Sequence, residues 1–231
     1  MRCGAVVPAA GSSRRMGSID KVLEPVAGRP SLLWVLAALA ASPRIAEVIV
    51  VVAQPKEAAV RALLAGERWP WPLVVCRGGA TRQESVAAGV ARLEPASELV
   101  LIHDAARPLV SAALIEDGIA CAELTGAAVA AIPVSDTIKR VGPDDQVLAT
   151  LERRELYAAQ TPQVFRRDWL ETAYLRRQPG EATDEASLLE QAGFPVQVYP
   201  GDPANLKLTR PIDLLVAGYL LERRRAQAAA P

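Results

Sequence analysis

The chain has 231 residues, of which 51% are hydrophobic, enough for one domain with a sizeable core. Lysine plus arginine equals aspartate plus glutamate at 26 each, so the formal net charge is zero and nucleic acid is not indicated as the main partner. Scattered cysteines, one histidine and the lack of a long apolar run argue against a disulfide framework, a zinc site and a membrane span, and we expect a cytoplasmic protein.

The first half of the chain alternates short β-branched runs with alanine- and leucine-rich stretches of helical length. We expect strands at 5–7, 47–52, 73–76 and 99–102, and helices at 31–41, 56–64, 81–93 and 112–124. Apolar strands separated by helices predict an α/β fold with a doubly wound, mostly parallel sheet. Ligands of such sheets bind beyond the carboxyl ends of the strands, so the segments after the first and fourth strands locate the expected site.

The sequence PAAGSSRRM at residues 8–16 follows the first strand, and Lys21 lies shortly after it. Its small residues allow the backbone to approach an anion, and Arg15 and Lys21 add positive charge where negative charge builds up in phosphoryl transfer. The segment lacks the GxxxxGK[ST] and GxGxxG spacings, which argues against a nicotinamide oxidoreductase. On its own it also fits a strand-to-loop turn with solvated arginines.

The sequence GGATRQESV at residues 78–86 precedes the third expected helix. Its glycines permit close backbone approach, and Ala80 or Thr81 begins the helix. Two interpretations fit this segment. It is either a glycine turn with a helix cap, or a wall on which Gly79 and Ser85 face a nucleobase.

The sequence HDAARP at residues 103–108 places a carboxylate and a guanidinium at the end of the fourth strand. Asp104 suits a metal ion or a substrate hydroxyl, and Arg107 suits a phosphate. A structural Asp–Arg pair across the loop is the alternative. His103 is interpreted as a structural residue, because it has no Asp or Ser partner at motif spacing.

Residues 135–141 alternate polar and apolar side chains, 142–145 form a strong turn signal, and 146–151 read as a return strand. This pattern predicts a β-hairpin arm over 133–157 that projects from a single domain spanning 1–231. An ordinary surface hairpin is the alternative.

Taken together and in this order, PAAG…RRMG…K, GGxxRxxSV, HDAARP, DTIK, QTPQxF, TDEA and NxKxT resemble the 2-C-methyl-D-erythritol 4-phosphate cytidylyltransferase family over residues 8–213. The first motif is widespread among sugar nucleotidyltransferases, whereas the combination is far more specific. The resemblance implies a Rossmann-like nucleotidyltransferase fold. It also implies a reaction of the non-mevalonate isoprenoid pathway, in which a phosphate oxygen of methylerythritol phosphate attacks the α-phosphorus of CTP and pyrophosphate leaves, with Mg²⁺ as cofactor.

The same resemblance implies roles for individual residues. Arg15, Lys21 and Lys207 match catalytic cations, and the nucleotide is assigned to Pro8, Ala9, Ala10, Gly11, Gly79, Ser85 and Asp104. The methylerythritol phosphate is assigned to Asp104, Ala105, Arg107, Thr137, Arg153 and Thr161. Thr137 and Arg153 match positions that reach into the partner subunit's site, which implies a homodimer formed through the arm.

Two other functions remain as alternatives. A cytidylyltransferase for another alditol phosphate, such as ribitol 5-phosphate, shares the nucleotide motifs and differs around Arg107, Thr137 and Arg153. A catalytically silent nucleotide-binding protein on the same fold predicts loss of the cations, yet Arg15, Lys21 and Lys207 are present.

Overall fold

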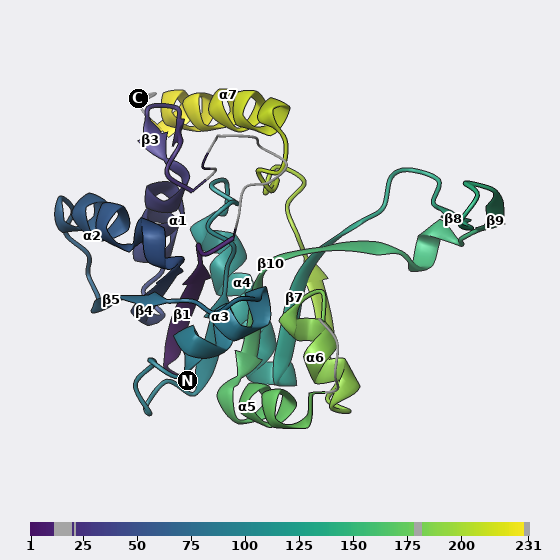
Figure 1. The fold of residues 1–231 in the computed structure, drawn as a ribbon, viewed down its shortest axis with the longest axis horizontal. Helices are drawn as coiled ribbons and strands as arrows, with labels where there is room; N and C mark the ends of the chain where they lie inside the picture. Colours follow the sequence, from purple (N-terminus) through teal and green to yellow (C-terminus); the bar gives the residue numbers. More distant parts are fainter. Residues whose placement is uncertain (12–19, 21, 178–181, 229–231) are drawn as a thin grey trace.

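A seven-stranded sheet forms the centre of the molecule. A computed structural model describes residues 1–11, 20, 22–177 and 182–228. The strands of the sheet are β1 (Cys3–Pro8), β4 (Ile45–Val52), β5 (Leu73–Arg77), β6 (Leu99–Ile102), β7 (Ala127–Pro133), β10 (Tyr157–Arg166) and β11 (Gln197–Pro200). Their order is β11-β7-β10-β6-β1-β4-β5, and only β10 runs antiparallel to its neighbours β6 and β7 (Figure 1). The prediction of a doubly wound, mostly parallel sheet is confirmed.

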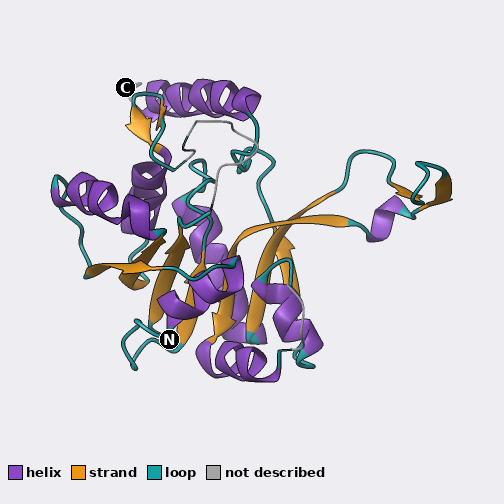
Figure 2. Ribbon diagram, viewed as in Figure 1, coloured by secondary structure: helices purple, strands orange, loops and turns teal. Residues whose placement is uncertain are grey.

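Helices cover both faces of this sheet (Figure 2). They are α1 (Ser31–Ala40), α2 (Glu57–Ala65), α3 (Arg82–Val90), α4 (Ala112–Thr125), α5 (Arg167–Arg176) and α6 (Glu185–Gln191). The last helix, α7 (Pro211–Ala228), packs in a separate cluster with Val26 and Leu109. Successive residues of a strand point to opposite faces, so Ala5 and Val7 of β1 pack with α1, α2 and α4, whereas Val6 packs with α3, α5 and α6. No helix within the described ranges is long and apolar enough to cross a bilayer.

The expected strands and helices of the first half are all present, with small shifts at their ends. Helix α3 is shorter than expected because the bonds of its last turn tighten: the amides of Arg92 and Leu93 donate to carbonyls three residues earlier, at 3.0 and 3.1 Å. A short 3₁₀ turn, η2 (Gln54–Lys56), precedes α2. A two-stranded ribbon that the sequence did not predict, β2 (Pro25–Val26) with β3 (Arg29–Pro30), leads into α1.

The arm is a separate antiparallel pair, β8 (Lys139–Val141) with β9 (Val147–Thr150), followed by the 3₁₀ turn η3 (Arg153–Glu155). It leaves the sheet after β7, returns into β10 and extends well away from the rest of the molecule (Figure 1). The predicted projection is confirmed, although the strands are shorter than expected.

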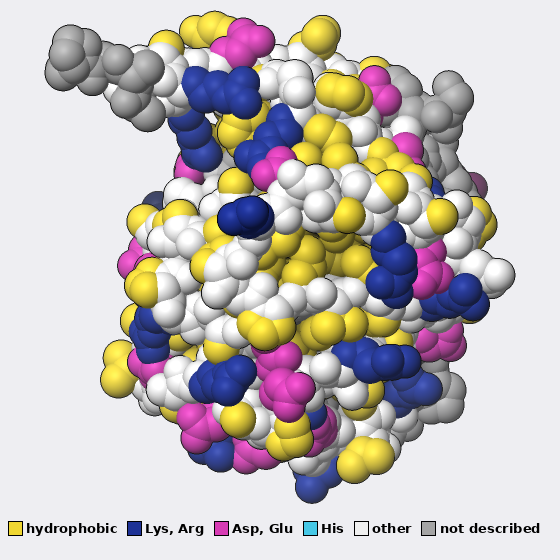
Figure 3. All heavy atoms as spheres, turned by 90° about the vertical axis from the view of Figure 1, so that its left-hand side faces the viewer, with side chains coloured by type: hydrophobic (Ala, Val, Ile, Leu, Met, Phe, Trp, Pro, Cys, Tyr) yellow, Lys and Arg dark blue, Asp and Glu magenta, His cyan; other side chains and the backbone are white. Residues whose placement is uncertain are grey.

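Figure 3 views the molecule from the side opposite the arm. Basic and acidic side chains are interspersed on this face.

Strand β10 is the main element that the sequence pattern did not predict. Pro162 lies within it and has no N–H to donate, so its sequence does not read as a ladder strand. The register with β7 shifts between Ala159 and Gln163, which takes 160–162 out of the regular ladder. The side chains of Gln160 and Thr161 are buried at this irregularity, next to the carboxyl end of β6.

Close packing of α3 on the sheet depends on Gly89. A Cβ at this position would lie 2.5 Å from Val6 Cγ1 and 2.8 Å from Val51 Cγ2, and both valines are fully buried. The absence of a side chain therefore lets α3 approach β1 and β4, which sets where its N-terminus meets the ends of the strands.

We expect Gly89→Ala to lower the free energy of unfolding by about 1–3 kcal/mol, because the added methyl group overlaps two valines that cannot move freely. Urea denaturation measures the change. Gly218→Ala is the matched control in a helix, since no atom lies within 4 Å of its added Cβ, and it is expected to stabilise by about 0.5–1 kcal/mol. An equal loss of stability in both variants would contradict the packing argument.

Candidate active site

A cavity of about 440 Å³ opens where the strand order of the sheet reverses. β4 lies on one side of β1 and β6 on the other, and the carboxyl ends of strands at such a switch point are where α/β proteins bind ligands. The cavity is lined by residues 8–11, Val22, residues 79–82, Ser85, Asp104, Ala106 and Lys207. The site predicted after the first and fourth strands is therefore a cavity.

The residues predicted for the nucleotide lie together in this cavity, although they come from distant segments. Pro8, Ala9, Ala10, Gly11, Gly79, Ser85 and Asp104 all line it. Gly78 allows the contact between the loop after β1 and α3, because a Cβ there would lie 2.5 Å from Ser85 Oγ and 3.0 Å from Ala10 Cβ. Which part of a nucleotide each residue contacts stays a prediction.

The start of α3 is fixed by a capping box. Thr81 Oγ1 accepts from the Glu84 amide at 3.1 Å, and the Glu84 carboxylate accepts from the amides of Ala80 and Thr81 at 2.7 and 3.3 Å. Ser85 Oγ donates to the Thr81 carbonyl at 2.8 Å, so its lone pairs stay available to a donor in the cavity. The helix cap is therefore confirmed, and the same segment also forms a wall of the cavity. That Gly79 and Ser85 face a nucleobase stays a prediction.

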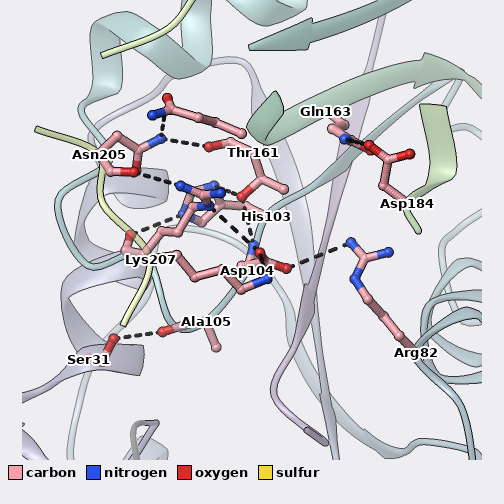
Figure 4. Close-up of polar contacts among 12 residues, drawn as sticks. Ser31, Arg82, His103, Asp104, Ala105, Thr161, Gln163, Asp184, Asn205 and Lys207 are labelled. Carbon is pink, nitrogen blue, oxygen red and sulfur yellow. Dashed lines mark hydrogen bonds and ion pairs between the residues drawn. The ribbon is translucent and has the colours of Figure 1, made fainter. Parts of the chain in front are cut away.

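Asp104 is the electrostatic centre of the site (Figure 4). Lys207 Nζ lies 2.7 Å from its Oδ2, Arg107 Nε lies 3.7 Å from the same oxygen, and Arg82 Nη2 lies 3.7 Å from Oδ1. Burial by itself raises the pKa of a carboxyl group, but Lys207, Arg82 and Arg107 together hold the pKa of Asp104 well below its ordinary value. Asp104 is therefore ionised at neutral pH.

The backbone of Asp104 is held by a chain of hydrogen bonds through His103 and Thr161. His103 Nε2 lies 3.1 Å from the Arg107 carbonyl, which only accepts, so Nε2 carries the proton and Nδ1 accepts from the Thr161 hydroxyl at 3.1 Å. The Asp104 amide then donates to Thr161 Oγ1 at 3.1 Å. Burial lowers the pKa of His103 from 6.5 to about 4, so the ring is neutral. Its burial and the two occupied nitrogens agree with the structural interpretation.

The remaining residues predicted for the acceptor do not line the cavity of this chain. Arg107 is largely buried behind Asp104 and donates through Nη1 to the Asn205 carbonyl at 2.7 Å. Ala105 turns its side chain inward, and its carbonyl accepts from Ser31 Oγ at 2.7 Å. The structural Asp–Arg pair, which the sequence left as an alternative, is present, and a role of Arg107, Ala105 and Thr161 in binding stays a prediction.

The structure places only some of the other predicted residues. Arg15 and Lys21 are outside the described residues. Thr137 and Arg153 are exposed on the arm, where Arg153 Nη1 donates to the Ser135 carbonyl at 2.6 Å. Lys207, by contrast, lines the cavity as the third predicted cation.

The sequence reasoning missed Arg82, which lines the cavity and pairs with Glu185 through a 2.6 Å contact from Nη1 to Oε2. A signal was available. Arg82 occupies the first turn of a helix, where the macrodipole disfavours a cation, and such a residue needs a carboxylate partner. Its partner Glu185 is buried at the start of α6, and the neighbouring Asp184 caps that helix.

Among the residues that the structure describes, no three His, Cys, Asp or Glu side chains are grouped to hold a metal ion. Asp104 is the only carboxylate among the described residues that line the cavity. Mg²⁺ commonly binds one or two carboxylates together with substrate phosphates and waters, so this donor set fits an ion brought in by a triphosphate.

The small residues after β1 let the backbone approach phosphate groups, and the cations around Asp104 can stabilise their charge. Both features lie at the switch point of the sheet, which places the chain among the α/β nucleotidyltransferases. The family model IspD, 2-C-methyl-D-erythritol 4-phosphate cytidylyltransferase, matches residues 3–223, and the chain belongs to this family.

Individual relatives agree with this assignment. The 2-C-methyl-D-erythritol 4-phosphate cytidylyltransferase of Dehalococcoides mccartyi is 42% identical over 97% of this chain and 98% of its own length, and that of Gloeobacter violaceus is 44% identical over 98% and 99%. The crystal structure of the Thermus thermophilus enzyme is similar with a TM-score of 0.77 and 34% identity, covering 96% of this chain and 100% of that one. The 4-diphosphocytidyl-2C-methyl-D-erythritol synthase of Anaerococcus prevotii is similar with a TM-score of 0.84 and 29% identity, covering 96% and 98%.

The buried His103 makes the stability of the fold depend on pH. The unfolded chain protonates this ring near pH 6.5, while the folded protein keeps it neutral down to about pH 4. The unfolded state therefore binds more protons between these values, and we expect His103 to remove up to about 3 kcal/mol of stability as the pH falls. Urea unfolding over this range measures the effect.

His103→Gln provides the comparison, because it removes the titrating ring and keeps an amide that can donate toward the Arg107 carbonyl. Glu185 acts in the opposite direction, since burial raises its pKa and favours the folded state as the pH falls. The variant is expected to lose less stability than the wild type between pH 6.5 and pH 4. Identical pH slopes would show that His103 is not buried in its neutral form.

Proposed function

We propose that this chain transfers the cytidylyl group of CTP to 2-C-methyl-D-erythritol 4-phosphate and releases pyrophosphate. The product is the cytidine diphosphate adduct of methylerythritol, an intermediate of the non-mevalonate isoprenoid pathway. The observation that carries the proposal is the cavity at the switch point, where Lys207 pairs with Asp104 opposite the small-residue loop 8–11. Membership of the cytidylyltransferase family over residues 3–223 supports the choice of nucleotide and acceptor.

The chemistry needs charge and position rather than a base. The nucleophile is a phosphate oxygen that is already anionic, so no proton has to be removed before it attacks the α-phosphorus in line. His103 fits this requirement, because it is buried, neutral and occupied by two hydrogen bonds. We assign Lys207 to the negative charge of the reacting phosphates, and Asp104 to holding the lysine and an acceptor hydroxyl.

Arg15 and Lys21 complete this proposal as cations around the triphosphate. We also assign Mg²⁺ to the reaction, held by triphosphate oxygens and waters with Asp104 as the available carboxylate of the described cavity lining. When bound, the ion neutralises and orients phosphate oxygens. A reduced, cytoplasmic setting agrees with the three free cysteines, Cys3, Cys76 and Cys121.

The arm is proposed to build a homodimer with shared sites. Val141, Val147 and Leu148 are exposed on it, which is the surface expected of a segment that packs against another subunit. Thr137 and Arg153 then contact the acceptor phosphate in the partner's cavity. Arg153 Nη1 donates to the Ser135 carbonyl and so links the two sides of the arm near its base.

Pyrophosphate release from the purified chain tests the function. We expect release with CTP, Mg²⁺ and methylerythritol phosphate, and none when the acceptor or Mg²⁺ is left out. Release with ribitol 5-phosphate alone would keep the chemistry and change the acceptor. No release with either acceptor would favour a nucleotide-binding protein without activity.

Mixed dimers test the shared site. Lys207→Ala removes a cavity cation and Arg153→Ala removes an arm cation, so each variant alone is expected to lose most of its activity at low acceptor concentration. If the arm contacts the partner's cavity, a mixed dimer of the two variants has one intact site out of two. About half of the dimers in an equal mixture are mixed, so the mixture regains about a quarter of the wild-type activity. Co-expression with two different tags yields the mixed species.

The double variant Lys207→Ala/Arg153→Ala, co-expressed with the wild type, is the control for subunit exchange. Its mixed dimers contain one site without Lys207 and one without Arg153, so they add no intact site. Failure of the two single variants to complement each other would show that the arm acts on its own subunit.

A further inference from the structure

Glu185 is a buried carboxylate that the proposed chemistry does not use. Its side chain is fully buried at the start of α6, Oε2 accepts from Arg82 Nη1 at 2.6 Å, and Oε1 has no hydrogen-bond partner in the part of the chain that the structure describes. Burial raises the pKa of Glu185, and Arg82 only partly offsets this. A buried ion pair with one unpaired oxygen is a poor source of stability, so its presence calls for another reason.

The helix that carries Glu185 is firmly anchored to the sheet. Asp184 caps α6 by accepting from the Ser187 amide at 2.9 Å, and its other oxygen accepts from Gln163 Nε2 of β10 at 2.7 Å (Figure 4). The start of α6 is therefore held against β10, and this fixes the position of the Glu185 carboxylate relative to Arg82.

Arg82 is held between two carboxylates. One of its terminal nitrogens is bound to Glu185, while the other lies 3.7 Å from Asp104 Oδ1, too far for a hydrogen bond. Asp104 itself is bound to Lys207 at 2.7 Å. Without the charge of Glu185, the closure of Arg82 onto Asp104 would be opposed, among the described residues, only by the more weakly interacting Asp184 and by repulsion from Lys207 and Arg107. Arg82 would then compete with Lys207 for the carboxylate.

We infer that Glu185 is a positioning residue for the acceptor substrate: by holding Arg82 back from Asp104, it keeps the Asp104 carboxylate paired with Lys207 and accessible from the cavity. This inference deepens the proposed function and rests on it. The ligand concerned is a polyol that bears a phosphate, whose hydroxyl groups suit an ionised carboxylate and whose phosphate suits the neighbouring cations.

Glu185→Gln tests the inference, because it keeps the shape of the side chain and an acceptor oxygen but removes the charge. We expect the KM for methylerythritol phosphate to rise about tenfold, the size of effect that follows loss of a charge-assisted contact, while the KM for CTP changes less than about twofold. Steady-state pyrophosphate release with each substrate varied in turn gives both constants.

Glu47→Gln is the matched control. Glu47 is also a buried glutamate, and it accepts from Ser97 Oγ at 2.6 Å and from the Glu94 amide at 3.0 Å, but it does not line the cavity. We expect this variant to lower the melting temperature and to leave both KM values unchanged.

Arg82 variants show whether Glu185 acts through this residue. Arg82→Gln removes the guanidinium that competes with Lys207, so it is expected to leave the KM for the acceptor near the wild-type value. Adding Glu185→Gln to this variant is expected to have no further effect, whereas Glu185→Gln alone raises this KM. Arg82→Lys keeps the charge but lacks the planar guanidinium that spans the two carboxylates, so it is expected to raise the KM for the acceptor. This variant provides the test if Glu185→Gln does not fold.

The outcomes separate the inference from the function on which it rests. Wild-type protein without turnover refutes the proposed function and the inference with it. Wild-type turnover together with an unchanged acceptor KM in Glu185→Gln, or in Arg82→Lys, overturns the inference alone. An equal rise of both KM values, or a loss of stability with neither KM changed, assigns Glu185 a merely structural role.

Discussion

A carboxylate buried at the end of a strand has to be balanced by nearby cations, and Asp104 imposes this requirement on the molecule. The cations come from three separate places: Arg82 from the start of α3, Arg107 from the loop after β6, and Lys207 from the segment before α7. Two of these cations also bind a group other than Asp104. Arg82 is balanced by Glu185, and Arg107 is bound to the Asn205 carbonyl.

The same constraint extends to β10, the antiparallel strand of the sheet. The backbone of Asp104 is held by Thr161, which lies where β10 departs from its ladder with β7. The antiparallel strand brings a hydroxyl, a glutamine and the carbonyl of Thr161 to the end of β6, and Asn205 binds that carbonyl at 2.8 Å. A strand with uninterrupted pairing would direct its polar backbone groups to its neighbours instead.

The sequence predicted the parts of this arrangement that depend on local pattern. Apolar runs such as 47–52 and 99–102 are buried strands because every second residue faces one layer of helices and the others face the opposite layer. The arm followed from its alternating residues and turn. Contacts between distant segments leave no such pattern: Arg82 and Glu185 are 103 residues apart. A cation at the start of a helix indicates that Arg82 needs a carboxylate, but the sequence does not indicate which one. Likewise, the motif of Arg107 does not show that its side chain is buried and pairs with Asp104, while its role as a phosphate ligand stays a prediction.

The balance of charge shows why the described part of the site calls for more cations. Arg82, Arg107 and Lys207 set against Asp104 and Glu185 leave a single positive charge. A phosphate monoester carries about −1.5 to −2 at neutral pH, and a triphosphate carries more, so one charge is far from enough when both substrates are bound. The cations proposed in addition are Arg15, Lys21, the partner's Arg153 and Mg²⁺. An ion that enters with the nucleotide adds positive charge only when negative charge arrives with it, which avoids mutual repulsion among cations in the empty site and leaves the fold to supply the core around Asp104.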